Sequence, residues 1–189
     1  MRLLIMGPPG AGKGTQAAVI AQLLGIPHIS TGDIFRANVS EGTPLGIEAK
    51  RYMDAGEYVP DGVTNAMVRD RLAQADCGPG FLLDGYPRTV EQVGELDGML
   101  KASGASLDRV IELTVDTDVV VGRLVKRAAD QGRSDDTEDV IRRRLEVYAE
   151  QTAPLIAAYQ SRGLVVRVNG MGDVAEVTSR VLAAVGVDG

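Results

Sequence analysis

A glycine-rich stretch near the N-terminus carries the residues best suited to chemistry. It reads Gly7-Pro8-Pro9-Gly10-Ala11-Gly12-Lys13-Gly14-Thr15. Glycines let successive backbone N–H groups turn toward a bound anion, and the N-terminus of a following helix adds partial positive charge. Lys13 supplies a full positive charge for the outer phosphates of a nucleotide. The pattern Gly-x4-Gly-Lys predicts a phosphate-binding loop, in which the hydroxyl of Thr15 comes one residue later than in the common form of the motif.

The loop lies between the two elements that such a site requires. Residues 2–6 form a short apolar run typical of a buried strand, and Ala17, Ile20 and Leu24 recur at helical spacing. Strand, glycine loop and helix in this order are the context in which the motif binds phosphate. The alternative is a glycine-rich turn before a helix, without a ligand.

Strands and helices are predicted to alternate along the rest of the chain. Further strands are predicted at residues 28–29, 81–84, 110–115 and 164–168. From residue 31 to about 59 helices follow one another without a strand, which predicts a small lobe over residues 30–59. The alternation favours an α/β fold, with a doubly wound, five-stranded parallel sheet and helices on both faces. We expect a single domain over residues 1–189.

Composition and charge restrict the class of protein. The chain has 189 residues and a net charge of −6, which disfavours general binding to nucleic acid. No apolar run approaches the roughly 20 residues of a membrane span, and a signal-peptide pattern is absent, so we expect a cytoplasmic protein without a membrane partner. Cys77 is the only cysteine, so we expect neither an internal disulfide nor a cysteine-rich zinc site.

Four segments occur in an order that points to one family. They are the phosphate loop extended to Gln16, Ser30-Thr31-Gly32-Asp33, Asp84-Gly85-Tyr86-Pro87-Arg88 and Gly132-Arg133-Ser134-Asp135-Asp136. With them the chain resembles the adenylate kinase family, in its short-lid form, from residue 2 to about residue 177. The resemblance implies a P-loop kinase that transfers the γ-phosphoryl group of MgATP to AMP, giving two ADP, with Mg²⁺ as cofactor. No sequence feature requires more than a monomer.

The resemblance implies which residues bind the donor. The phosphate loop would hold the ATP phosphates, Arg127 would stack near adenine, and Asp84 would orient Mg²⁺ through water with Thr15 near the metal. An acid that only caps a strand end is the alternative for Asp84. The implied ATP-binding residues are Gly10, Ala11, Gly12, Lys13, Gly14, Thr15, Arg123, Arg127, Gly170 and Gly172.

The acceptor site follows from the same resemblance. Arg36 and Arg88 would fork onto the AMP phosphate, which suits planar guanidinium groups. Gln92 would hydrogen-bond the adenine edge, whereas Met53 has simple core packing as its alternative. The implied AMP-binding residues are Thr31, Arg36, Met53, Glu57, Tyr58, Val59, Gly85, Tyr86, Arg88, Gln92, Arg133 and Arg144, and the implied catalytic residues are Lys13, Arg88, Arg123, Arg133 and Arg144.

The segment over residues 126–136 is too short for the larger lid of some family members, and it lacks cysteines for a lid zinc. We therefore expect a short lid without zinc. Lid and lobe are expected to close on the substrates, because a wet site would hydrolyse ATP.

Other functions remain open at this point. A kinase that prefers UMP or CMP shares the short lid, although Thr31 and Gln92 favour AMP. A GTP-binding switch would need an Asn-Lys-x-Asp motif and an Asp-x-x-Gly segment, and neither Asn169-Gly170-Met171-Gly172-Asp173 nor Asp84-Gly85 fits. A non-enzymatic ATP-binding module leaves the acceptor arginines unexplained.

Overall fold

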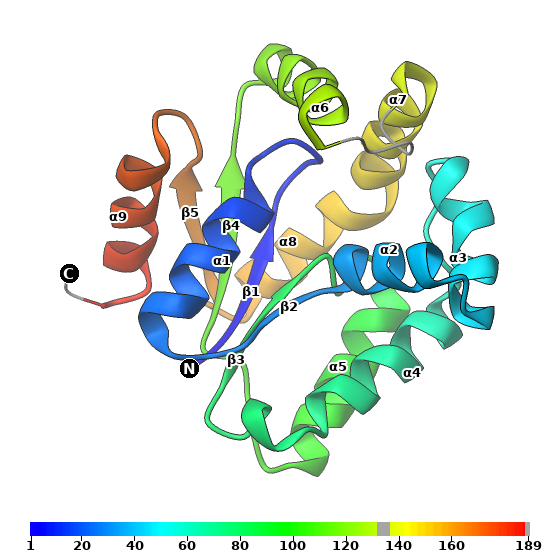
Figure 1. Cartoon of the computed structure of the whole chain (residues 1–189). Helices are drawn as coiled ribbons and strands as arrows, with labels where there is room; N and C mark the ends of the chain where they lie inside the picture. Colours follow the sequence, from blue (N-terminus) through cyan, green and yellow to red (C-terminus); the bar gives the residue numbers. More distant parts are fainter. Residues whose placement is uncertain (132–136, 188–189) are drawn as a thin grey trace.

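The computed structural model describes residues 1–131 and 137–187. Its centre is a parallel sheet (Figure 1), with strands in the order β2-β3-β1-β4-β5. The strands are β1 (Arg2–Met6), β2 (His28–Ser30), β3 (Phe81–Asp84), β4 (Arg109–Thr114) and β5 (Val165–Asn169). Every pairing in the sheet is parallel. The predicted α/β fold with five parallel strands is confirmed.

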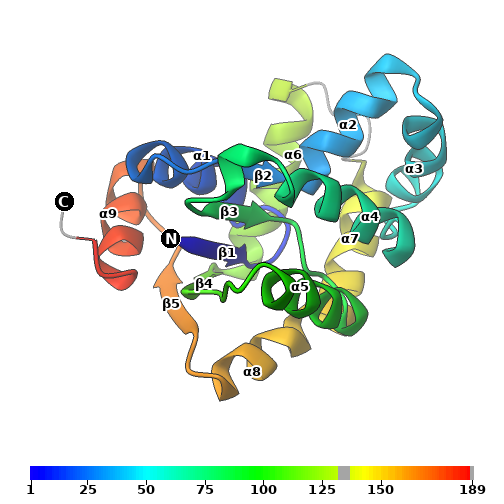
Figure 2. The ribbon, with the colours of Figure 1, turned by 90° about the horizontal axis from the view of Figure 1, so that it is seen from below.

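Alternate residues of β1 divide the core into two layers, because successive side chains of a strand point to opposite faces. Leu3 and Ile5 pack with the cluster under α1 (Lys13–Leu24) and α9 (Val174–Ala184). Leu4 and Met6 join the cluster on the opposite face. Figure 2 shows α1 on one side of the sheet and two helices, α5 (Val90–Ala102) and α8 (Ala153–Ser161), on the other.

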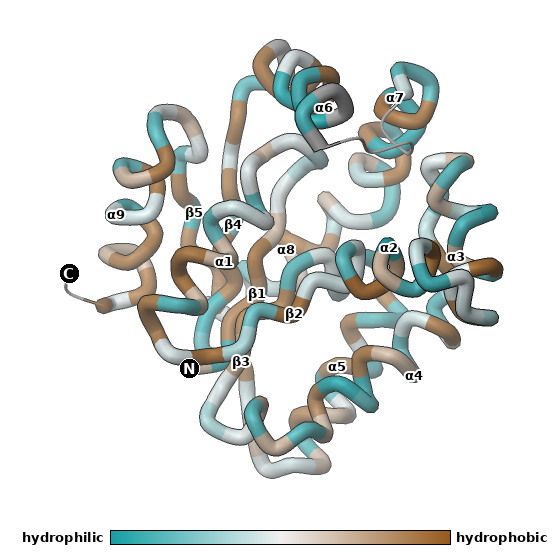
Figure 3. Tube along the Cα trace, in the orientation of Figure 1, coloured by the Kyte–Doolittle hydropathy of each residue, from teal (hydrophilic) through white to brown (hydrophobic). Residues whose placement is uncertain are grey.

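The opposite face also carries α4 (Asp61–Leu72), which contributes Val68 to the same cluster and leads into the short 3-10 helix η1 (Ala75–Cys77). In Figure 3 apolar residues follow the strands, while peripheral helices alternate between hydrophobic and hydrophilic colours, as amphipathic helices do. Within the described ranges, no helix combines the length and apolar composition needed to cross a bilayer.

The region predicted as a small lobe contains α2 (Thr31–Glu41) and α3 (Pro44–Asp54), which pack against each other at one side of the molecule (Figure 1). Its own small cluster of buried side chains contains Phe35, Ala49 and Val59. This local core gives the segment a packing unit beside the main sheet, although whether it moves as a lobe stays a prediction.

Two further helices follow β4 in the chain: α6 (Thr117–Gln131) and α7 (Glu138–Val147). The predicted lid takes in the last turns of α6, and its residues 132–136 lie outside the described part of the chain. The sequence pattern predicts one helix over residues 139–151. Instead, α7 passes into a π-helical segment, η2 (Tyr148–Thr152), which continues into α8.

The packing of α2 on α3 generates a stability prediction. A Cβ at Gly46 would overlap the backbone carbonyl group of Asn38, whereas a Cβ at the exposed Gly98 in α5 would meet open space. We expect Gly46→Ala to lower the free energy of unfolding by about 1–3 kcal/mol through overpacking. Gly98→Ala, the matched control, should raise it by about 0.5–1 kcal/mol because alanine favours helix. Thermal and urea unfolding measure both; equal effects of the two changes would contradict the close helix contact.

Candidate active site

A cavity of about 910 Å³ opens at the carboxyl end of the sheet. The chain leaves β1 toward β2, on one side, and leaves β3 toward β4, on the other. The neighbouring strands β1 and β3 therefore form a topological switch point, where open α/β sheets bind ligands. The phosphate loop follows β1, and Asp84 ends β3, so both line the cavity.

The phosphate loop turns into α1 at Gly12, which has φ +91° and ψ 15°. A Cβ at this position would meet no neighbouring atom, so glycine is favoured by the left-handed backbone conformation alone. Within the described chain, no side chain caps this helix N-terminus. The first turn of α1 therefore presents backbone N–H groups and partial positive charge at the cavity, as a phosphate site requires.

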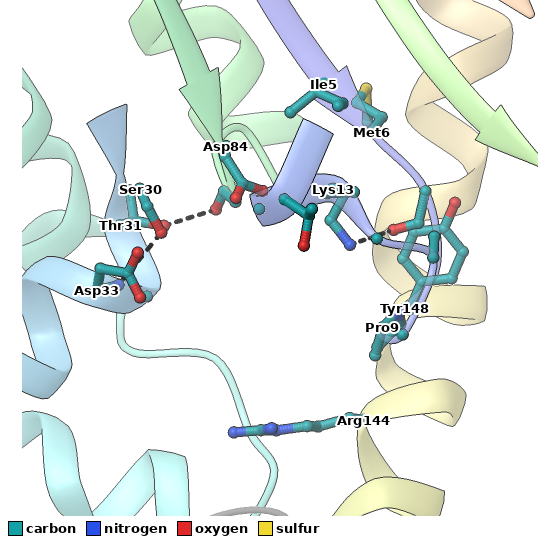
Figure 4. Close-up of a pocket in the computed structure, with 18 of the residues that line it drawn as sticks. Ile5, Met6, Pro9, Lys13, Ser30, Thr31, Asp33, Asp84, Arg144 and Tyr148 are labelled. Atoms are coloured by element: carbon teal, nitrogen blue, oxygen red, sulfur yellow. Dashed lines mark hydrogen bonds between the residues drawn. The ribbon is translucent and has the colours of Figure 1, made fainter. Parts of the chain in front are cut away.

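Lys13 folds back onto the loop that carries it. Its Nζ atom donates hydrogen bonds to the carbonyl oxygens of Gly7 at 2.8 Å and Pro8 at 3.0 Å (Figure 4). Burial lowers the pKa of the ammonium group to about 8, and the positive charges of Arg88 and Arg127 oppose the attraction of Asp84. A phosphate in the cavity would favour the charged form of Lys13.

Asp84 and Thr15 are the predicted metal-side residues, and both line the cavity. The Asp84 side chain is largely buried, with one carboxylate oxygen 3.6 Å from Nε2 of His28, while Thr15 is exposed at the start of α1. A carboxylate and a hydroxyl are hard oxygen donors, which fit a Mg²⁺ that is shared with phosphates and water. Among the described residues there is no group of three or more His, Cys, Asp or Glu side chains placed to hold a metal.

On the acceptor side, local caps set the positions of several predicted residues. The Ser30 hydroxyl accepts a hydrogen bond from the Asp33 N–H at 3.2 Å, so Thr31 becomes the first residue of α2. Thr31 in turn donates to the Gly85 carbonyl at 2.9 Å (Figure 4). Gly85 has φ +83°, and a Cβ there would lie 2.7 Å from the Thr31 hydroxyl. This glycine lets the loop after β3 approach α2.

Arg88 lies in the loop between β3 and α5. Its guanidinium group lies over the ring of Tyr58, 5.0 Å from the ring centroid. Its backbone N–H donates to Oε1 of Gln92 at 2.7 Å, and the Gln92 amide donates to Asp61 at 2.8 Å. Gln92 is buried and already bonded at both ends of its amide, so its contact with adenine stays a prediction.

The remaining predicted cations come from α2, α6 and α7. Arg36 pairs with Asp33 within α2. Arg123 on α6 reaches the carbonyl of Gly170 at 3.4 Å, which joins it to the turn predicted to meet the ATP adenine. Figure 4 shows Arg144 extending from α7 across the open cavity. Arg133 lies outside the described residues.

The structure thus gathers the predicted site into one cavity, although contact with a nucleotide stays a prediction. Every described residue of the predicted set lines it: Gly10, Ala11, Gly12, Lys13, Gly14, Thr15, Thr31, Arg36, Met53, Glu57, Tyr58, Val59, Asp84, Gly85, Tyr86, Arg88, Gln92, Arg123, Arg127, Arg144, Gly170 and Gly172.

Sequence reasoning missed several residues at this site. The cavity is also lined by His28, Lys126, Tyr148 and Thr152. The sequence suggested that Arg143 points away from the site, and it does not line the cavity, yet its Nε donates to Glu57 at 2.6 Å and joins α7 to the small lobe. The resemblance had already placed Glu57 in the acceptor site, but nothing in the sequence indicated its pairing with Arg143. The buried, uncharged Thr152 carried none.

Comparison with known proteins agrees with this geometry. A family model described as adenylate kinase matches residues 5–164. The chain is 67% identical over 187 residues to an adenylate kinase of a Nocardioides species, a match that covers 99% of this chain and 98% of the relative. Adenylate kinases of Kocuria rhizophila and Thermobifida fusca are 64% and 56% identical, with 97% of each chain covered in both matches. These matches, together with the phosphate loop at the end of β1, show that the chain belongs to the adenylate kinase family.

Proposed function

We propose that this protein is an adenylate kinase, which reversibly transfers the γ-phosphoryl group of MgATP to AMP and thereby helps to balance the adenine nucleotides. The observation that carries the proposal is that one cavity is lined both by the phosphate loop and by Thr31, Arg36 and Arg88. Two nucleotides bound on these two sides would meet with their phosphates between them. Relatives at 56–67% identity bear the name of this enzyme, so a UMP/CMP kinase or a nucleotide switch is not favoured.

The chemistry requires positioning and charge neutralisation more than a covalent nucleophile. Lys13 would exchange the carbonyls of Gly7 and Pro8 for the outer phosphate oxygens, and the N–H groups at the start of α1 would bind the remaining donor oxygens. Asp84 would orient Mg²⁺ through water, with Thr15 near the metal, and the ion would supply positive charge to the donor phosphates.

On the other side of the cavity, Arg36 and Arg88 would bind the AMP phosphate, while Thr31 and Gln92 contribute to base selection. Arg123, Arg133 and Arg144 would stabilise the charge on the group in transfer, an arrangement in which one arginine can be worth about 10³–10⁵ in rate. Closure of the lid (126–136) and lobe (30–59) would exclude water. A monomer in the cytoplasm remains the expectation from the sequence.

Turnover of the four monophosphates tests the proposal directly. We expect purified protein with MgATP to form ADP rapidly from AMP and slowly, or not at all, from CMP, UMP or GMP, measured by coupled ADP assay. Preferred turnover of CMP or UMP would keep the phosphate chemistry but reject AMP as acceptor. Failure to use any monophosphate would reject a kinase function altogether.

Removing Arg88 should separate the two substrates. We expect Arg88→Ala to raise the KM for AMP by about 10- to 150-fold, the worth of a hydrogen bond to a charged group of about 1.5–3 kcal/mol, with the KM for ATP nearly unchanged. Arg69→Ala is the matched control, because Arg69 pairs with Glu95 on the surface and does not line the cavity. Steady-state kinetics give both constants, and equal losses for ATP and AMP would mean that Arg88 is assigned to the wrong substrate.

The lowered pKa of Lys13 predicts a pH effect. The lysine of the free protein loses its proton near pH 8, whereas bound phosphates hold it charged. Above about pH 8 the free form becomes mostly neutral, so ATP binding should take up a proton there and take up little well below that pH. Calorimetry in buffers of different ionisation enthalpy measures this uptake, and ATP affinity should fall as pH rises above 8.

Lys13→Met is the control for this measurement. The variant should keep its circular dichroism spectrum, lose phosphoryl transfer and show no linked proton uptake. Proton uptake of equal size in the variant would assign the linkage to another group.

A further inference from the structure

Thr152 occupies an unusual place at the edge of the cavity. It ends the π-helical segment η2, is 5% exposed and lines the cavity. A threonine inside a helix commonly bonds the carbonyl four residues back. The two hydrogen bonds described for this hydroxyl instead reach Arg88 and Tyr58, which are 64 and 94 residues away in the sequence.

The direction of these two hydrogen bonds follows from their chemistry. The carbonyl oxygen of Arg88 only accepts, so Thr152 uses its single hydroxyl hydrogen to donate to it at 2.9 Å. The phenol of Tyr58, 2.6 Å from the same hydroxyl oxygen, must then be a donor. A chain of hydrogen bonds thus runs from Tyr58 through Thr152 to the backbone of Arg88.

Arg88 is held at three points by this arrangement. Its N–H donates to Gln92, its carbonyl accepts from Thr152, and its guanidinium group lies over the Tyr58 ring at 5.0 Å from the centroid. Since Arg88 lies in a loop, side chains replace the backbone partners that a helix or strand would give it. Thr152 acts on two of the three points, because it bonds both the Arg88 carbonyl and the residue that supports the guanidinium group.

The segment that carries Thr152 is itself firmly attached. Just beyond η2, α8 buries Leu155, Ile156 and Tyr159 in the core on one face of the sheet. Toward the N-terminus, η2 continues from α7, which carries Arg144. Short π-helical segments within α-helices are frequently found at functional sites. Here the segment brings a hydroxyl from a core helix to the loop that bears an acceptor-side arginine.

From this geometry we infer that Thr152 is a positioning residue for Arg88, and through it for the phosphate of the acceptor nucleotide. The inference rests on the proposed function, because it gives Arg88 the acceptor phosphate as its ligand. A hydroxyl with only a structural role would affect stability and leave the two substrates equally well bound. Thr152 as a positioning residue affects one substrate, AMP, in particular.

Three variants of Thr152 test the inference. Thr152→Val keeps the shape but removes both hydrogen bonds, Thr152→Ser keeps the hydroxyl, and Thr152→Ala serves if the valine variant does not fold. We expect the valine or alanine variant to raise the KM for AMP by about 3- to 10-fold, the scale of one or two hydrogen bonds, with the KM for ATP within about twofold of the wild type. The serine variant should restore the KM for AMP.

Thr178→Val is the matched control for loss of a buried hydroxyl. Thr178 is 7% exposed and bonds Gln16 and the Val174 carbonyl, away from Arg88. The Thr178→Val variant should lower the melting temperature about as much as Thr152→Val, with no change in the KM for AMP.

Tyr58→Phe tests whether the phenol donates to Thr152. This change should raise the KM for AMP when made in the wild type. It should add little when made in the Thr152→Val variant, because the two residues share one chain of hydrogen bonds.

The outcomes separate this inference from the proposed function. If the wild type does not turn over AMP, the proposed function fails. If the wild type is active on AMP while Thr152→Val keeps the wild-type KM for AMP, the positioning role alone is rejected. Equal rises in the KM values for ATP and AMP, or no recovery with Thr152→Ser, would also reject it in favour of a structural role.

Discussion

Burial of the Lys13 ammonium group, in a cavity that also holds other cations, is the constraint on which this site depends. The protein is acidic as a whole, with a net charge of −6, yet it concentrates positive charge where two phosphorylated nucleotides are proposed to meet. Without ligand, Lys13 experiences burial and the charges of Arg88 and Arg127, which lower its pKa to about 8. The carbonyls of Gly7 and Pro8 and the carboxylate of Asp84 partly compensate. The site is therefore prepared for anions, which relieve its own electrostatic cost.

The sheet topology explains how such a cluster is assembled from distant parts of the chain. Parallel strands present their carboxyl ends at one edge, and the order β2-β3-β1-β4-β5 places the phosphate loop beside the loop after β3. Helices α6 and α7 then bring further arginines from the opposite side (Figure 1). The rigid core clusters on the two faces of β1 hold this edge in place, so the cations belong to loops and helix ends on a fixed base.

Neutral hydrogen bonds give the charged groups their positions. Arg88 has its backbone bonded by Gln92 and Thr152, and Tyr58 supports its side chain. Arg143 joins α7 to Glu57, in the segment predicted as a small lobe. These contacts make the acceptor side a connected unit, in which the small lobe, the loop after β3 and the helix carrying Arg144 meet.

Local sequence patterns were enough to predict the strands, the phosphate loop and the family. These features are local: the apolar run before Gly7, the glycine at position 12 and the cap at Ser30 each act within a few residues, so spacing alone reveals them. The resemblance to the family also supplied the candidate site residues, which the structure places around one cavity. Contact of those residues with ATP and AMP is still a prediction.

The way in which those residues are held depends on contacts between elements that lie far apart in the sequence. The hydrogen bonds of Thr152 join residues that are 64 and 94 positions apart in the sequence, and the Arg143–Glu57 pair joins residues 86 positions apart. At such separations, motif spacing does not indicate which side chains meet. The π-helical segment was likewise missed, since its residues read as an ordinary helix. Side-chain partners depend on packing between elements, and packing is fixed only when the whole chain has folded.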